Sequence, residues 1–367
     1  MRWNPRLEGM RAYEPGKTIG EVKKEFGLHR IVKLASNENP FGCSAEVKKF
    51  IAEAGLETAL YPDGYATGLR EALSAKLGIT PRQLLFGAGS DELIVILSRA
   101  LLSENDNTVM PWPSFPQYRH NARIQGAEIR EVPLLEDFSH DLDGMLKAID
   151  ENTSIVWLCT PNNPTGGIIP QKDLKAFIRE VPEHVLVVVD NAYHEFVTDP
   201  SYGDPLDLVE EFPNVLVLRT FSKAYGLAAF RVGYAIGKEE LIAKLDPVRP
   251  PFNTNVLGQQ AAALALRDQP FIDSTRQQNE AGKEQYARFA EAHGLKCPRS
   301  EANFVLMEVK GSADAAADEL LKRGYIVRSG DKLGTPGYVR ITVGTREDNE
   351  GLLAALEEVL AQGVSEA

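Results

Sequence analysis

Residues 214 to 231 read Asn214-Val-Leu-Val-Leu-Arg-Thr-Phe-Ser-Lys-Ala-Tyr-Gly-Leu-Ala-Ala-Phe-Arg231. The first five residues form an apolar run that predicts a buried strand. Lys223 follows just past this strand, with Ser222 before it and Arg231 eight residues after it. Because an ammonium group is costly to bury in a loop, we expect the amine to serve as a nucleophile that forms a Schiff base. The alternative is a solvated loop lysine with a surface arginine nearby.

The residues near Lys223 suggest that an anion binds beside its amine. Ser222 and Arg231 are the residue types that hold an anion, and they lie close to the amine in sequence. An imine-forming lysine beside a phosphate clamp is the combination that pyridoxal 5′-phosphate (PLP) needs. The stretch therefore predicts a PLP site.

Apolar runs alternate with amphipathic segments in the part of the chain before this stretch. Strands are expected at 84–86, 108–110, 155–159 and 185–189, with helices at 91–102 and 171–180 between them. This order predicts an α/β fold with a mostly parallel sheet between helices. Beyond about residue 250 the pattern changes to that of a smaller α+β domain. We expect an N-terminal arm that is part of the small domain at 1–45, a large PLP-binding domain at 46–248 and a small C-terminal domain at 249–367.

Composition narrows the class of protein. The 367 residues carry a net charge of −12 and are 43% hydrophobic, which is typical of soluble globular proteins and argues against nucleic-acid or acidic-membrane binding. The three cysteines have neither a disulfide nor a metal-ligand spacing, so a cytoplasmic protein without a metal is expected. No apolar run approaches the ~18 residues of a membrane span.

Polar residues collect just past the carboxyl ends of the predicted strands. Ligands of open α/β sheets bind at that edge. The Gly87-Ala-Gly89 turn precedes a helix whose N-terminus suits a phosphate, although such turns are often structural. A nicotinamide site is disfavoured because Glu92 occupies the third glycine position of that motif. The residues at this edge are Ser90, Asn163, Asp190, Tyr193, Ser222 and Lys223.

Asp190 ends the most apolar strand, where a carboxylate is costly unless it is paired. Opposite a pyridinium nitrogen it would keep that nitrogen protonated; the alternative is a helix cap or a structural ion pair. Tyr193 and Asn163 would hydrogen-bond the phenolic oxygen of the ring, and Phe115 would stack on it. The alternative for Tyr193 is a half-buried structural tyrosine. The alternative for Asn163 is turn formation, and that for Phe115 is simple core packing.

Two arginines in the predicted second domain suit anionic substrates. Arg340 lies between Val339 and Ile341 in a predicted strand, and Arg328 ends a shorter one. A guanidinium fork matches a carboxylate or phosphate. Surface exposure is the alternative, and it is a better one for Arg328 than for Arg340.

Together these residues give the chain a resemblance to the fold-type-I PLP-dependent aminotransferases of class I/II, and within them to the histidinol-phosphate branch. The resemblance implies a seven-stranded sheet in the large domain. One departure is that Asp190 is followed by Asn191-Ala-Tyr193-His194, where the family usually has Glu-Ala-Tyr. The motifs that carry the resemblance are Lys33-Leu-Ala-Ser-Asn-Glu-Asn-Pro40, Tyr61-Pro-Asp63, Pro161-Asn-Asn-Pro-Thr-Gly166, Asp190 with Tyr193, Thr220-Phe-Ser-Lys-Ala-Tyr-Gly226 and Val339-Arg-Ile-Thr-Val-Gly-Thr345.

The resemblance also implies roles. Lys223 would bind the cofactor covalently, and Ser90, Asp91, Ser222 and Arg231 would bind its phosphate. Arg340 would grip the anionic end of the substrate. The residues that would help it bind the substrate are Arg328, Tyr13 and Asn37. Tyr61 would reach the cofactor phosphate of a second subunit in a homodimer with shared active sites.

The implied reaction is transamination between L-histidinol phosphate and 2-oxoglutarate, which gives imidazole-acetol phosphate and L-glutamate in histidine biosynthesis. Three alternatives use a similar scaffold. They are an aromatic amino-acid aminotransferase, a decarboxylase acting on threonine phosphate, and a non-catalytic PLP-binding regulator. The regulator ranks last because the acidic chain has no spare segment for a DNA-reading domain.

Overall fold

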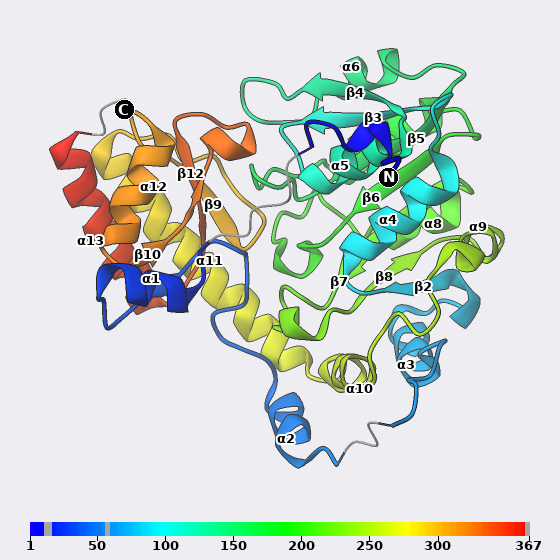
Figure 1. Ribbon diagram of the computed structural model, residues 1–367, viewed down its shortest axis with the longest axis horizontal. Helices are drawn as coiled ribbons and strands as arrows, with labels where there is room; N and C mark the ends of the chain where they lie inside the picture. Colours follow the sequence, from blue (N-terminus) through cyan, green and yellow to red (C-terminus); the bar gives the residue numbers. More distant parts are fainter. Residues whose placement is uncertain (11–16, 56–58, 364–367) are drawn as a thin grey trace.

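The computed structural model describes residues 1–10, 17–55 and 59–363. Figure 1 shows a large part, built on a wide sheet, and a C-terminal part with a smaller sheet. The long helix α11 (Gln269–His293) runs from one part into the other. The domain limits expected at 45/46 and 248/249 stay a prediction.

The wide sheet has seven strands and is mostly parallel, which confirms the expected fold class. β8 pairs antiparallel with both of its neighbours, and the other neighbouring strands pair in parallel. Across the sheet the order is β2 (Leu84–Gly87), β8 (Gly233–Ile236), β7 (Val215–Thr220), β6 (Leu186–Asp190), β5 (Thr153–Cys159), β3 (Asn107–Trp112) and β4 (Glu128–Pro133).

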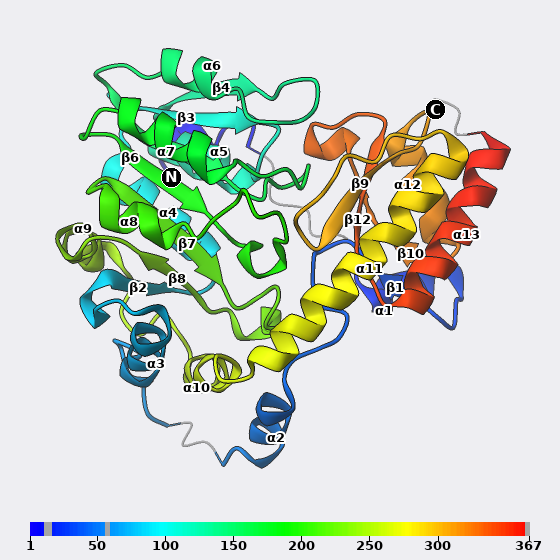
Figure 2. The ribbon, with the colours of Figure 1, turned by 180° about the vertical axis from the view of Figure 1, so that it is seen from behind.

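The central strands are apolar because both faces of the sheet are covered. In β5, Val156 and Leu158 enter one core, whereas Ile155 and Trp157 enter the core on the other face. Helices α4 and α5 cover one face in Figure 1, and α7 and α8 cover the other in Figure 2. The helices of this part are α2 (Ala45–Glu53), α3 (Thr67–Leu77), α4 (Ser90–Leu101), α5 (Pro116–Gln125), α6 (Leu142–Lys147), α7 (Gln171–Glu180), α8 (Leu206–Glu211), α9 (Glu239–Leu245) and α10 (Val256–Ala265).

Two strands of the sheet, β4 and β8, were not predicted from the sequence. β4 is a half-exposed edge strand whose sequence, Glu128-Ile-Arg-Glu-Val-Pro133, lacks an apolar run. β8 has only four residues and begins with Gly233. β4 is a strand because it pairs with β3, and β8 is a strand because it pairs with β2 and β7.

The C-terminal part packs helices against a three-stranded antiparallel sheet. The arm contributes β1, which pairs in parallel with β10. It also contains the helix α1, which was not expected in this arm. The elements are α1 (Ile19–Phe26), β1 (Val32–Lys33), β9 (Phe304–Glu308), α12 (Ala313–Lys322), β10 (Tyr325–Ile326), β11 (Arg328–Ser329), β12 (Tyr338–Thr342) and α13 (Arg346–Gln362). Short 3-10 helices are η1 (Pro5–Leu7), η2 (Pro81–Gln83), η3 (His194–Phe196), η4 (Ala228–Phe230), η5 (Asp246–Val248) and η6 (Asp331–Leu333).

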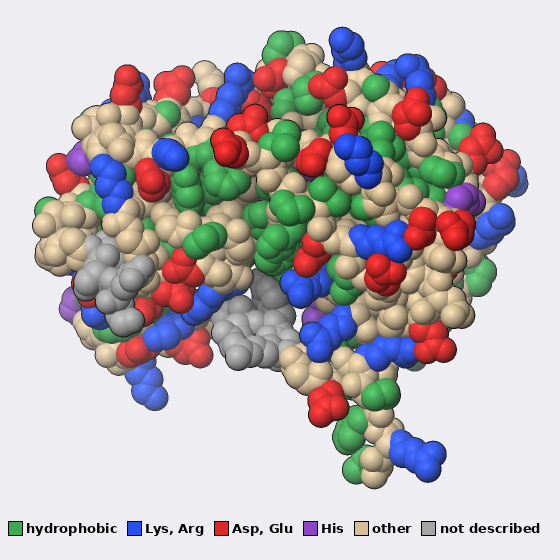
Figure 3. Space-filling view, turned by 90° about the horizontal axis from the view of Figure 1, so that it is seen from above, with side chains coloured by type: hydrophobic (Ala, Val, Ile, Leu, Met, Phe, Trp, Pro, Cys, Tyr) green, Lys and Arg blue, Asp and Glu red, His purple; other side chains and the backbone are tan. Residues whose placement is uncertain are grey.

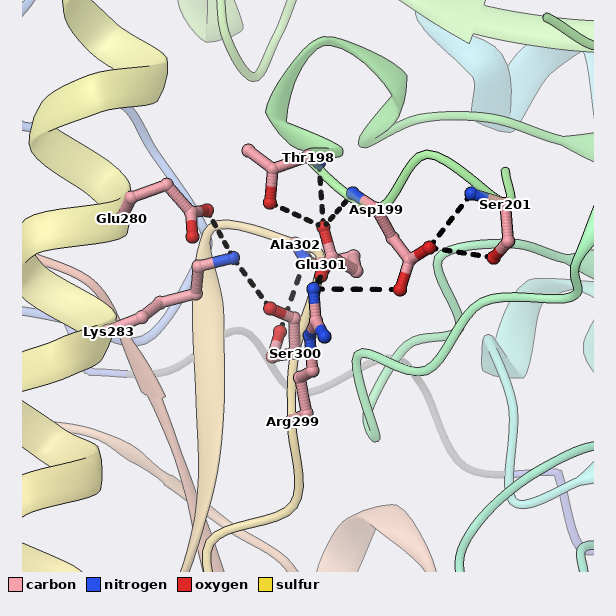
Figure 4. Close-up of polar contacts among 9 residues, drawn as sticks. All are labelled: Thr198, Asp199, Ser201, Glu280, Lys283, Arg299, Ser300, Glu301 and Ala302. Carbon is pink, nitrogen blue, oxygen red and sulfur yellow. Dashed lines mark hydrogen bonds and ion pairs between the residues drawn. The ribbon is translucent and has the colours of Figure 1, made fainter. Parts of the chain in front are cut away.

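A polar junction around Glu301 links the two parts (Figure 4). The buried carboxylate of Glu301 accepts hydrogen bonds from the backbone N–H groups of Thr198 and Asp199 at 2.7 and 3.3 Å. Its other oxygen accepts from Arg299 Nε at 2.9 Å. The segment before β9 is thereby attached to the loop after η3.

Charge is spread over the surface. On the face seen in Figure 3, acidic and basic side chains are interspersed over both parts, and apolar side chains gather along the middle. Among the described residues, no helix has the length and apolar character needed to cross a bilayer.

Candidate active site

A cavity of about 310 Å³ lies at the carboxyl ends of β5, β6 and β7. Residues 35–37 and residues of β11 and β12 close its other side. Tyr61 does not line it, and Tyr13 lies outside the described residues. The other predicted site residues all line this cavity: Asn37, Ser90, Asp91, Phe115, Asn163, Asp190, Tyr193, Ser222, Lys223, Arg231, Arg328 and Arg340.

Lys223 lies in the turn that follows β7. The turn closes at Gly226, where φ is +68° and an added Cβ would lie 1.8 Å from the carbonyl oxygen of Gly42, so only glycine permits this approach. Lys223 Nζ donates to the carbonyl oxygen of Ser36 at 3.0 Å. Burial, reinforced by the guanidinium of Arg340, lowers the pKa of Lys223 to about 8. A useful fraction of the amine is therefore neutral, and hence nucleophilic, near neutral pH.

An anion cradle forms where α4 begins. Arg231 Nη1 lies 3.3 Å from Ser222 Oγ, and Nη2 donates to the carbonyl oxygen of Ala88 at 3.2 Å. At Gly89, φ is +80° and a Cβ would lie 2.5 Å from Arg231 Nη2, so glycine keeps this corner open. The first N–H groups of α4, at Ser90, add the positive end of a helix dipole. The cradle suits a phosphate group.

Asp190 is the buried acid of the cavity. It ends β6 and is 3% exposed. Burial raises its pKa to about 6, although hydrogen bonds from Tyr118 and from the Ala192 N–H act in the opposite direction. Among the described residues, no ion pair includes Asp190. A buried carboxylate that lines a cavity and forms no ion pair among the described residues suits a protonated ring nitrogen.

Asn163 and Tyr193 are held by residues of the C-terminal part and the arm. Tyr193 Oη accepts from Asn37 Nδ2 at 2.9 Å. Asn37 in turn donates its backbone N–H to Thr342 Oγ1 at 2.9 Å. Asn163 Oδ1 accepts a hydrogen bond from Arg340 Nη1 at 2.5 Å. The oxygen of this amide is thus fixed by Arg340, and its NH₂ group is the side that can donate. Two donors suited to a phenolate oxygen thus line one cavity.

Arg340 and Arg328 lie opposite each other on paired strands. Arg340 is 6% exposed, and its Nη2 also donates to the carbonyl oxygen of Ala35 at 2.7 Å. Its guanidinium lies 5.3 Å from the centroid of the Phe304 ring. Two adjacent guanidinium groups in a cavity favour an anionic substrate.

Phe115 and Tyr61 have different surroundings. Phe115 is half-buried, lines the cavity and meets Tyr118 edge to face at 5.7 Å. Tyr61 is 82% exposed and stacks on Phe252, with ring centroids 4.7 Å apart. Within one chain, Tyr61 therefore lies outside the cavity lining, and its role toward a second subunit stays a prediction.

Asn191 and His194, which follow Asp190 where the family usually has Glu-Ala-Tyr, add no charge to this segment. Asn191 is fully buried, and its Nδ2 donates to the carbonyl oxygen of Thr160 at 2.9 Å. Burial lowers the pKa of His194 to about 3, so its imidazole is neutral.

Two polar partners at the site were not singled out by sequence. Tyr118, on α5, donates its hydroxyl to Asp190 Oδ2 at 2.6 Å. Thr342, two residues after Arg340 on the same strand face, holds Asn37. A period-two reading of β12 would have placed Thr342 beside Arg340, whereas no local pattern connects Tyr118 with Asp190.

The residues present fit PLP. The cradle at Gly89 is shaped for its phosphate, the buried Asp190 carboxylate for its ring nitrogen, and the amine of Lys223 for its aldehyde carbon. The amide of Asn163 and the hydroxyl of Tyr193 complete the donor set around the ring.

Comparisons with known proteins agree with this geometry. The family model for aminotransferase class I and II matches residues 29–356. Histidinol-phosphate aminotransferases of Lysinibacillus sphaericus and Bacillus subtilis are each 53% identical to the chain, over 99% and 98% of it and 100% of each relative. A histidinol-phosphate aminotransferase of Sinorhizobium meliloti, solved in complex with pyridoxal-5′-phosphate, superposes with a TM-score of 0.90 at 28% identity and 98% coverage of both chains.

The chain belongs to the aminotransferase class I and II family. The expected resemblance and fold class are thereby confirmed, and PLP is the cofactor. The two curated relatives named above are both histidinol-phosphate aminotransferases. The roles of individual site residues stay a proposal that rests on the geometry above.

Proposed function

We propose that this chain transfers an amino group from L-histidinol phosphate to 2-oxoglutarate, giving imidazole-acetol phosphate and L-glutamate, in histidine biosynthesis. The observation that carries the proposal is the placing of Arg328 and Arg340 in the same cavity as Lys223. Both amino donors of this reaction carry an anionic group that a guanidinium pair can bind. The curated relatives support the same substrate over the aromatic and decarboxylase alternatives.

Within this proposal, the residues that line the cavity divide the tasks among them. Arg340 and Arg328 bind the phosphate or carboxylate of the donor and set its orientation. Bound PLP supplies a pyridinium ring that accepts the electron pair released at the substrate α-carbon. Asp190 would stay negatively charged and so keep the ring nitrogen protonated. Lys223 Nζ would hold the cofactor at its aldehyde carbon, and its amine would serve as the base and acid that moves the proton at the substrate α-carbon.

Replacement of Lys223 by alanine tests the assignment. Lys223→Ala is expected to retain PLP binding through the phosphate cradle but to lose transamination by at least roughly a thousandfold, because both the covalent link and the proton carrier are removed. The measurement is glutamate formation from histidinol phosphate and 2-oxoglutarate, with tyrosine, phenylalanine and threonine phosphate as competing donors. Borohydride reduction of the wild-type protein should attach the cofactor to Lys223.

The matched control is Lys322→Ala, which removes an exposed lysine at the end of α12. It should leave the rate unchanged. Full activity in Lys223→Ala would refute the role of this amine. Carbon dioxide release from threonine phosphate without glutamate formation would replace the proposed reaction by decarboxylation.

We further propose that the chain acts as a homodimer in the cytoplasm. Large apolar side chains are exposed together around the Tyr61 turn: Leu60 (73%), Tyr61 (82%), Tyr65 (61%) and Phe252 (46%). A second copy would cover them and bring Tyr61 to its cofactor phosphate. The three cysteines are free thiols, which supports a reducing compartment.

A further inference from the structure

Tyr118 is a fully buried tyrosine that lies behind the cavity and not in its lining. Its ring stacks on Trp157, with centroids 4.7 Å apart and planes 13° apart. Trp157 is fixed in turn, because its Nε1 donates to Thr108 Oγ1 at 2.9 Å. The hydroxyl of Tyr118 donates to Asp190 Oδ2 at 2.6 Å. A stacked ring on a tethered partner leaves this hydroxyl little freedom to point elsewhere.

The carboxylate of Asp190 is held at both of its oxygens. Oδ2 accepts from Tyr118, and Oδ1 accepts from the backbone N–H of Ala192 at 3.2 Å. These two bonds fix the plane of the carboxyl group while the lone pairs that face the cavity stay available. Among the described residues, Tyr118 is the side chain with a hydrogen bond to this carboxylate.

We propose that Tyr118 is a positioning residue whose hydroxyl orients the Asp190 carboxylate and holds it in its ionised form for the ring nitrogen of the cofactor. The inference rests on the proposed function, since it assigns the task of Tyr118 through the PLP that Asp190 serves. Tyr118 itself touches neither substrate nor cofactor. Burial raises the pKa of its phenol well above the usual value, so it stays a neutral donor.

The charges around Asp190 make this donor important. Burial raises the pKa of the Asp190 carboxyl, and Asp91 on α4 adds to this rise, whereas the Tyr118 hydroxyl, the Ala192 N–H and Lys223 lower it. The thiol of Cys159 on β5 and the phenol of Tyr193 also face the group, and burial keeps both neutral by raising their pKa. Removing the Tyr118 hydroxyl therefore raises the pKa of Asp190 above about 6, and its charge is lost at a higher pH than in the wild type.

The experiment is a titration of apo-protein with PLP at pH 7 and at pH 9. Tyr118→Phe retains the ring that stacks on Trp157 and deletes only the hydroxyl, so the fold is expected to survive. The dissociation constant for PLP should rise roughly tenfold relative to wild type at pH 7, where the variant carboxyl is partly protonated. At pH 9 both proteins carry an ionised Asp190, and the ratio should fall below about threefold.

The control is Tyr286→Phe, which deletes another fully buried hydroxyl, bonded to Asn349 Oδ1 at 2.8 Å in the C-terminal part. It should leave PLP binding unchanged at both pH values. In an Asp190→Asn background, Tyr118→Phe should have no further effect, because the group on which it acts is neutral. Urea unfolding of each variant reports its folded fraction and keeps lost affinity separate from lost structure.

Wild-type PLP affinity in Tyr118→Phe at pH 7 would overturn the inference. So would an equal loss at both pH values, or an undiminished loss in the Asp190→Asn background, because each of these is the behaviour of a structural tyrosine. A wild-type protein that takes up no PLP would instead overturn the proposed function, on which the inference rests.

Discussion

At the scale of single residues, Arg340 is where the C-terminal part meets the cofactor side of the cavity. One Nη bonds Asn163, 177 residues earlier in the chain, and the other bonds the carbonyl oxygen of Ala35. Burying a charge this deeply is costly unless hydrogen bonds replace its water. The planar fork satisfies two acceptors at once, which the single ammonium of lysine cannot do in the same geometry.

Arg340→Lys tests this use of the fork. We expect the KM values for histidinol phosphate and for glutamate to rise together, each by an amount equivalent to roughly 1.5–3 kcal/mol, because both anions lose a charge-assisted hydrogen bond. Steady-state kinetics with each donor measure the effect. Arg346→Lys, at an exposed arginine that pairs with Glu350, is the control and should change neither KM. A rise for one donor alone would mean that Arg328 or another group anchors the second donor.

At the scale of elements, the segment between α11 and β9 is attached to the large part by a buried carboxylate. Figure 4 shows Glu301 between the Thr198–Asp199 backbone and the Arg299 side chain. The neighbouring Ser300 carbonyl oxygen accepts from Lys283 Nζ on α11 at 2.6 Å. Gly166, at the end of the Asn-Asn-Pro-Thr-Gly turn, accepts from the Glu301 N–H through its carbonyl oxygen at 2.9 Å. This junction therefore connects α11 to the turn that carries Asn163.

Glu301→Gln should destabilise the protein by about 1–3 kcal/mol, because an amide cannot accept hydrogen bonds at both ends and its NH₂ group would face a donor. The change is measured as the free energy of unfolding in urea at a fixed protein concentration. Glu284→Gln, at an exposed position of α11, is the control and should stay within about 0.5 kcal/mol of wild type. Equal stability of both variants would show that water replaces the Glu301 contacts without loss.

At the scale of the whole molecule, the cavity is closed by the C-terminal part but lacks Tyr61. That residue stacks on Phe252 at the surface of its own chain. In Figure 1 helix α2, which precedes the Tyr61 turn, lies at the margin of the large part next to α10. Aromatic rings exposed together at such a margin are typical of a surface that a second copy covers.

Subunit mixing tests the shared site. Lys223→Ala and Tyr61→Phe proteins, each impaired alone, should regain up to about a quarter of wild-type activity when mixed under conditions of subunit exchange. Half of the dimers are then mixed, and each mixed dimer has one site with both residues intact. Mixing Lys223→Ala with the Lys223→Ala/Tyr61→Phe double variant should restore nothing. A fully active monomer in sedimentation at the assay concentration would contradict the arrangement.

Local sequence was enough to predict the elements that carry the chemistry. The apolar runs before Asp190 and Lys223 predict buried strands, because a strand covered on both faces must be apolar throughout. The Gly87-Ala-Gly89 turn before a helix predicts an anion cradle, because backbone conformation and helix dipole are local properties. β4 and β8 could not be predicted in this way, since their neighbours make them strands.

Which of these residues meet was decided only by the tertiary structure. Ser36 lies 187 residues before Lys223, and Tyr118 lies 72 residues before Asp190, yet each pair shares a hydrogen bond. Spacing along the chain carries no information about such pairs, because they form only when strand order and helix packing bring distant segments together. The sequence by itself determined the chemical groups of the site and the strand ends that bear them. The tertiary structure decided how Arg340 reaches Asn163 and how Tyr118 reaches Asp190, since burial and donor geometry exist only after the sheet and the C-terminal part have packed.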